Sequence, residues 1–267
     1  MTGLGVGALS ALAGIGGGVV MVPFLYLVYA STGVSLSAQT VVAHATSLGV
    51  AFVASSYGTW HYAKADAVAW RTALAYAVPG IPSAFLTARL LTQTAEVEWL
   101  RAAFGIFLII SGADMVRRAL AGPESEPGEL TPHSLGWLAA VGVVGGAASA
   151  ALGIGGGLIA VPALMYVGRL PVRSIAPTAL AGVWLTTLTG WIGYLTAGPG
   201  PPVSTWVVGF VDGRMAVPLA LGALCTVPLG VRVNRRVAPP TLYWSFAALL
   251  LILGAMLIRG WLSGGAR

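Results

Sequence analysis

A fifteen-residue phrase occurs twice in this chain, as ALAGIGGGVVMVPFL at residues 11–25 and as AALGIGGGLIAVPAL at residues 150–164. The two copies match at nine of fifteen positions, including a glycine triplet and a proline five residues after it. Each copy lies inside a strongly apolar stretch. Glycine and proline interrupt helices, and a helix interrupted at membrane depth leaves backbone groups that need a partner. The phrase therefore predicts two similar halves, each with a broken helix.

The composition is that of an integral membrane protein. Hydrophobic residues make up 57% of the 267 residues, charged residues only 8%, and the mean hydropathy is +0.86. At about 20 residues per helical span, this length allows roughly seven to nine spans and no sizeable soluble domain. The net charge of +6 comes from basic residues scattered singly or in pairs between apolar stretches. This pattern is typical of loop charges at a membrane surface and argues against nucleic-acid binding.

Motifs of common enzymes and cofactor sites do not occur in the sequence. HExxH, Walker A, GxSxG and paired cysteines are missing, and GIGGG does not fit the GxGxxG dinucleotide pattern. The single cysteine, Cys225, excludes an internal disulfide and a thiolate metal cluster, and we expect it to be a small buried side chain. We therefore expect no enzyme activity, no cofactor and no metal. No basic segment of a cleavable signal peptide precedes the first repeat.

Two groups of four apolar stretches flank one polar connection, AGPESEPGELTPH at residues 121–133. We divide the chain into a first repeat (1–120), a polar linker (121–133) and a second repeat (134–267). Landmarks recur in the same order in both halves, and the pairs are Thr46 with Thr178, Asp66 with Asp212, Arg89 with Arg232, Phe104 with Phe246 and Gly112 with Gly254. The second half has extra residues around 198–202, which predict a longer loop there.

The repeats can be parallel or inverted, depending on the glycine phrase. If GIGGG interrupts a crossing helix, each half has four crossings and the halves are parallel; if it is the tip of a re-entrant hairpin, each has three and they are inverted. The parallel arrangement divides the 14 basic residues evenly between the two faces, whereas the inverted one divides them nine to five. Because cytoplasmic loops carry more Lys and Arg, we favour inversion, with both termini outside and the linker in the cytoplasm.

The glycine phrases are candidate walls of an anion site. Consecutive glycines let backbone amides converge, and the helix that follows offers its positive N-terminal end. Close helix packing is the alternative explanation for small residues in a membrane. Hydroxyls nearby could complete the site, while Pro23 and Pro162 are expected to break or kink the following helix. The predicted substrate-binding residues are Gly14, Gly16, Gly17, Gly18, Gly153, Gly155, Gly156, Gly157, Thr46, Ser47 and Thr178.

Few ionisable residues lie within the apolar stretches. His44 is a candidate proton-coupling group or ligand donor, with a hydrated interfacial histidine as the alternative. Asp114 stands three and four residues before Arg117 and Arg118, which predicts a local ion pair. Asp66 and Asp212 are expected to cap the helices that follow them.

The duplicated GIGGG followed by VP, the ATSL that follows at residues 45–48, and HYAKADAVAWR at residues 61–71 together resemble the TauE/SafE family of sulfite exporters and sulfonate permeases. The resemblance covers essentially the whole chain. It implies a plasma-membrane permease for sulfite, sulfonates or related anions, coupled to the proton gradient. The second half reads PTAL where the family often has TS, so Ala179 replaces a hydroxyl.

The sequence thus predicts an all-α polytopic membrane protein of two homologous, inverted repeats. Each repeat has a glycine-broken first helix, re-entrant or discontinuous, and three spanning helices. The predicted function is a secondary transporter of small sulfur-containing anions that works by alternating access. An anion channel, a transporter of small carboxylates and a non-transporting membrane partner remain alternatives. The expected partners are the anion, the bilayer and, as an open option, further copies of the chain.

Overall fold

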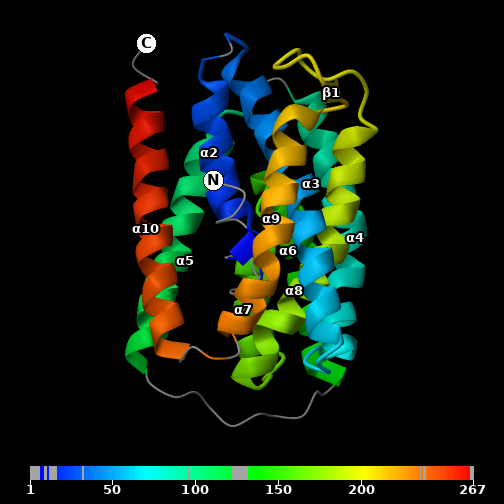
Figure 1. Cartoon of the computed structure of the whole chain (residues 1–267), viewed down its shortest axis with the longest axis vertical. Coiled ribbons are helices and arrows are strands. Elements are labelled where there is room, and N and C mark those ends of the chain that lie inside the picture. Colours follow the sequence, from blue (N-terminus) through cyan, green and yellow to red (C-terminus); the bar gives the residue numbers. More distant parts are fainter. Residues whose placement is uncertain are drawn as a thin grey trace.

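The computed structural model describes residues 7–8, 11, 17–31, 33–94, 97–121, 132–234, 236 and 239–264. Helices dominate these residues (Figure 1). The helices of the first half are α2 (Gly18–Tyr29), α3 (Leu36–Ala63), α4 (Trp70–Gln93) and α5 (Trp99–Ala121). Those of the second half are α6 (Pro132–Leu152), α7 (Gly157–Tyr166), α8 (Val172–Leu195), α9 (Gly213–Asn234) and α10 (Pro239–Gly264).

Six helices in the described part of the chain are long and apolar enough to cross a membrane: Leu36–Ala63, Trp70–Gln93, Trp99–Arg117, Ser134–Leu152, Arg173–Leu195 and Gly213–Asn234. The centre of the bundle consists mainly of α3 and α8, whose side chains are largely buried. Large apolar side chains point outward from the surrounding helices, as Leu90, Ile110 and Leu221 do with at least 60% of their surface exposed. An apolar exterior of this kind suits a lipid solvent. The prediction of an all-helical polytopic membrane protein is therefore confirmed.

The helices alternate in direction along the bundle (Figure 1). In this view α3 and α5 run downward and α4 runs upward, whereas α8 and α10 run upward and α9 runs downward. The short helix α2 leads to the upper end, and α7 leads to the lower end. The helix order therefore places the C-terminal end of α2 and that of α7 on opposite faces of the bundle.

The loop between α8 and α9 contains a small antiparallel hairpin, β1 (Val207–Val208) paired with β2 (Val211–Asp212). It falls in the segment where the sequence predicted extra length. The hairpin ends at Asp212, directly before α9, and the Asp212 Oδ1 accepts the backbone N–H of Arg214 at 3.0 Å. This is the predicted cap of the helix.

Two sequence expectations are wrong. Asp66 does not cap α4, because the helix begins after Ala69 and has no side-chain cap; Asp66 instead lies in the preceding turn with φ +50°. Cys225 is exposed on α9 rather than buried. A small polarisable thiol is tolerated on the outer face of a helix in an apolar solvent, so its exclusion from water does not require burial inside the protein.

Candidate functional site

Each glycine phrase contains a left-handed turn from which a helix starts. Gly17 precedes α2 with φ +81°, and Gly156 precedes α7 with φ +76°. These two glycines occupy equivalent positions in the two copies of the phrase. Only glycine adopts this conformation without strain, so the sequence identity follows from the backbone. In the second copy Gly153 and Gly155 also have positive φ, and the break separates α6 from α7. Gly14 and Gly16 lie outside the described residues.

The two prolines lie inside the helices that follow the glycine turns. Pro23 is in α2 and Pro162 is in α7, and both helices continue beyond them. The helices are therefore interrupted at the glycines and not at the prolines. Each proline still removes one backbone donor from its helix.

The two glycine phrases touch each other in the centre of the protein. A side chain on Gly18 would collide with the carbonyl oxygen of Gly153 and the Cα of Ile154. The Ser47 hydroxyl on α3 donates to that same Gly153 carbonyl at 2.6 Å. Gly17, Gly18 and residues 153–157 are all buried. The predicted glycine residues that are described and Ser47 thus come together at one buried crossing point.

The two predicted threonines make matching contacts between the halves. The backbone N–H of Asp212, just before α9, donates to Thr46 Oγ1 at 3.0 Å. The backbone N–H of Ala69, just before α4, donates to Thr178 Oγ1 at 3.0 Å. Thr46 of the first half therefore binds the segment that enters α9, and Thr178 of the second half binds the segment that enters α4. Because their N–H groups bind equivalent threonines, Asp212 of the second half corresponds to Ala69 of the first half. The order of residues in the sequence had suggested Asp66 instead.

A second matching pair holds the start of each glycine phrase. Tyr62 near the end of α3 donates to the Ala11 carbonyl at 2.8 Å, and Tyr194 near the end of α8 donates to the Ala150 carbonyl at 2.9 Å. Ala11 and Ala150 are the first residues of the two copies. Both tyrosines are fully buried. The same interaction therefore anchors the glycine phrase in each half.

His44 lies at the crossing point and is completely buried. A Cβ added to Gly153 would lie only 2.7 Å from the Cα of His44. Its Nε2 hydrogen-bonds to the Tyr26 hydroxyl of α2, while Nδ1 has no hydrogen-bond partner among the described residues. The alternative of a hydrated interfacial histidine is therefore wrong. The second half has Ala176 and Pro177 near the related place and offers no ionisable group there, so His44 makes the site asymmetric.

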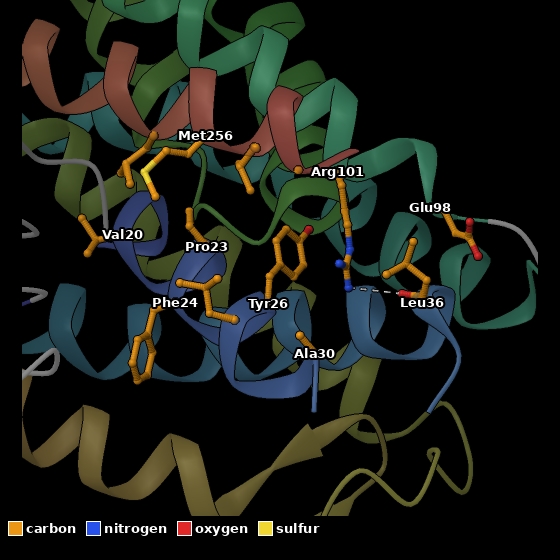
Figure 2. Close-up of a pocket in the computed structure, with 13 residues that line it drawn as sticks. Val20, Pro23, Phe24, Tyr26, Ala30, Leu36, Glu98, Arg101 and Met256 are labelled. Atoms are coloured by element: carbon orange, nitrogen blue, oxygen red, sulfur yellow. Dashed lines mark hydrogen bonds between the residues drawn. The ribbon is translucent and has the colours of Figure 1, made fainter. Parts of the chain in front are cut away.

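Tyr26 connects His44 to a cation at the end of the bundle (Figure 2). The Arg101 guanidinium lies 4.2 Å from the centre of the Tyr26 ring, a cation–π contact. Arg101 also donates to Thr40 Oγ1 at 2.8 Å and to Gln39 Oε1 at 3.2 Å. Sequence reasoning did not assign Tyr26 and Arg101 to the site, since nothing in the local sequence links α2 to the start of α5.

Asp212 is a carboxylate with only 1% of its surface exposed. Tyr29 of α2 donates to its Oδ2 at 3.0 Å, and Ser204 donates to its Oδ1 at 2.7 Å. With the Arg214 N–H, three donors hydrogen-bond to the carboxylate, and no cationic side chain of the described residues forms an ion pair with it. Asp212 therefore ties the first-half α2 to the second-half α9.

The predicted ion pair of Asp114 with Arg117 is confirmed. Arg117 Nη2 lies 2.8 Å from Asp114 Oδ1 near the end of α5. The side chain of Arg118 is not described. An i,i+3 pair with Arg117 67% exposed contributes little to stability, so Asp114 is not part of the buried site.

Two helices that start at left-handed glycine turns inside a lipid-facing bundle are features of a polytopic membrane protein with polar backbone at membrane depth. The family model of the sulfite exporter TauE/SafE matches residues 1–257. The chain belongs to this family and is a membrane transporter.

Curated relatives carry the same kind of name. "Probable membrane transporter protein YunE" of Bacillus subtilis is 27% identical over 96% of this chain and 94% of its own length. A similarly named protein of Methanocaldococcus jannaschii is 26% identical over 97% of this chain and 93% of its own length. No solved structure matches the chain. Full-length similarity of this kind supports one shared transporter architecture.

Proposed function

We propose that the protein is a plasma-membrane secondary transporter that moves sulfite, a sulfonate or a similar small sulfur-containing anion by alternating access. The observation that carries the proposal is the contact between the two glycine phrases, one from each half, at Gly18 and Gly153. A single anion bound at this crossing point would contact both halves. Relative motion of the halves could then expose it to either side of the membrane.

The chemistry of the crossing point suits an anion. α2 and α7 both start there, and the first amides of a helix have no partner within the helix. Neither helix has an acidic residue in its first turn. The positive ends of two helix dipoles therefore act on the same buried region. The Ser47 hydroxyl, now donating to Gly153, supplies a further donor when the two phrases separate.

Reciprocal contacts support inverted repeats. At the α3–α8 interface Gly58 packs on Leu180 and Gly190 packs on Leu48, and both equivalent pairs are 132 residues apart in the sequence. At the α5–α10 interface Gly105 faces Gly254 and Gly112 faces Ala247, again related by one constant offset. Contacts that exchange in this way are those of a pseudo-two-fold axis. Because the paired helices are antiparallel, that axis lies in the membrane plane.

The distribution of basic residues supports an orientation. The bundle end that contains the junctions α3–α4, α7–α8 and α9–α10 carries Lys64, Arg71, Arg117, Arg169, Arg173, Arg232 and Arg236. The opposite end carries Arg89, Arg101, Arg214 and Arg259. The excess of cations at the first end supports a cytoplasmic location for it. The end of α10 then lies outside.

The contact between the two glycine phrases gives the transport cycle a physical basis. With Gly18 against the Gly153 carbonyl, no space for an anion remains between these two residues. Binding between these residues therefore requires the start of α2 and the turn between α6 and α7 to move apart. His44, which touches Gly153 through its backbone and α2 through Tyr26, is placed to couple this movement to a proton.

A flux measurement tests the function and the coupling together. Purified protein in proteoliposomes is expected to show saturable uptake of labelled sulfite or a short sulfonate, driven by a pH gradient. His44→Gln should retain anion exchange but lose accumulation driven by the gradient, because glutamine cannot take up a proton. His61→Gln, at the end of α3, is the matched control and should retain both.

Three results would contradict the proposal. Single-channel conductance without saturation would favour a channel, and transport of small carboxylates alone would replace the substrate class. Unchanged gradient-driven accumulation in His44→Gln would remove His44 from the coupling.

A further inference from the structure

A groove of about 460 Å³ lies between α2, the start of α5 and α10 (Figure 2). Along α2 it extends from Val20 to the C-cap Ala30, a span of roughly 15 Å. Its long walls are apolar and include Phe24 of α2 and Leu257 of α10. Leu27 and Met256 at its edges have 70% and 57% of their surfaces exposed. The groove therefore opens sideways, towards the lipid.

The charged end of the groove is Arg101. This residue is in the first turn of α5, two positions after Trp99, whose side chain is 58% exposed. Exposed tryptophans at the ends of spans mark the membrane–water interface. The groove thus has a cation at headgroup depth and an apolar trough that continues towards the bilayer interior. Figure 2 shows Arg101 at one end of the groove and Val20 at the other.

Arg101 makes no ion pair within 4 Å among the described residues, although the Glu98 carboxylate three residues earlier acts on it electrostatically. Its guanidinium donates to neutral acceptors, Thr40 Oγ1, Gln39 Oε1 and, at 3.5 Å, the Leu36 carbonyl. Glu98 also lines the groove, but it accepts from Ser37 and makes no ion pair with Arg101 within 4 Å. The neutral hydrogen bonds and the Tyr26 ring hold the guanidinium in place, and no carboxylate among the described residues pairs with it directly. An anionic group is therefore the complementary partner.

We propose that this groove binds an anionic phospholipid of the outer leaflet. The phosphate contacts the Arg101 guanidinium at the interface, and one acyl chain fills the trough between α2 and α10. The bilayer supplies molecules that combine an anionic head with a long apolar chain at this depth. The bound lipid would pack on Pro23 and Tyr26 of α2, the helix whose start forms one wall of the glycine crossing point.

The test compares lipids with the same acyl chains and different heads, added to the purified full chain in a neutral detergent. Phosphatidylglycerol is expected to bind roughly fivefold more tightly than phosphatidylcholine, by native mass spectrometry and by thermal shift, because one arginine acts on the added charge. Arg101→Gln should abolish this preference. Arg214→Gln, which removes an exposed arginine at the same end of the bundle outside the groove, should retain it.

A second variant keeps the test decisive if Arg101→Gln does not fold. Met256→Trp fills the trough and leaves Arg101 in place, so it should weaken binding of both lipids by a similar factor. An unchanged preference in Arg101→Gln, equal binding of both lipids to the unmodified protein, or full binding to Met256→Trp would overturn the proposal. So would an equal thermal shift from glycerol phosphate or from a free alkyl sulfonate, since the occupant would then not be a membrane lipid.

Discussion

Replacing Gly156 with alanine is expected to reduce anion flux at least about tenfold, whereas Gly136→Ala should leave it unchanged. Gly156 has φ +76°, a conformation that costs an L-residue about 1–2 kcal/mol. The new Cβ would also lie 3.1 Å from the Gly145 carbonyl and 3.3 Å from the Tyr76 hydroxyl. Strain and crowding would both displace the start of α7, and with it the amides that the proposed anion site uses. Gly136 is exposed in α6 and a Cβ there meets nothing within 4 Å.

Two further alanine variants separate strain from crowding. Gly33 has φ +71° but open space around it, so Gly33→Ala should cost stability and leave the flux intact. Gly18 has no positive φ, but a Cβ would meet the other glycine phrase, so Gly18→Ala should impair flux through crowding alone. Labelled-anion uptake into proteoliposomes, corrected for the amount of folded protein, measures all four variants. Normal flux in both Gly156→Ala and Gly18→Ala would show that the crossing point is not the transport site.

Asp212→Ala is expected to destabilise the protein by about 2–4 kcal/mol. The carboxylate accepts from the Tyr29 and Ser204 hydroxyls and from the Arg214 backbone, and its removal leaves all three donors without this acceptor. Because Asp212 is buried, the three donors cannot turn to bulk water instead. Because Tyr29 and Asp212 belong to different halves, the loss should also loosen the contact between the halves.

Asp114→Ala is the matched control for the Asp212 variant. Asp114 makes one ion pair, with the largely exposed Arg117, so its loss should change the free energy of unfolding by about 0.5 kcal/mol or less. Denaturant unfolding in detergent micelles, followed by tryptophan fluorescence, measures both variants. Equal effects of the two substitutions would contradict the assigned role of Asp212.

The sequence predicted the helical membrane fold and the place of the helix breaks because these depend on composition and on local conformation. A left-handed turn favours glycine wherever it lies in the fold, and the repeat marked Gly17 and Gly156 as equivalent. Hydrophobic stretches likewise indicated the helices, because a span must satisfy its backbone internally. These features require no knowledge of which helices touch.

The interactions that assemble the candidate site could not be read from the sequence. Tyr26 with His44, Tyr29 with Asp212, and Ser47 with Gly153 join residues 18, 183 and 106 positions apart. Their partners depend on how the helices pack. The pairing of Asp66 with Asp212 failed for a related reason, because the helix after Asp66 begins three residues later than counting suggested. The matching contacts of Thr46 and Thr178 show that Asp212 and Ala69 are equivalent, although their residue types differ.

Labelling of one cysteine at the crossing point tests the central claim most directly. Ser47→Cys in a Cys225→Ser chain places a thiol beside Gly153, since Cys225 is the only cysteine. We expect a membrane-impermeant thiol reagent to reach this cysteine in right-side-out and in inside-out vesicles, and sulfite or a sulfonate to slow labelling in both. Labelling from one side only, or labelling that no anion slows, would contradict a shared anion site with alternating access.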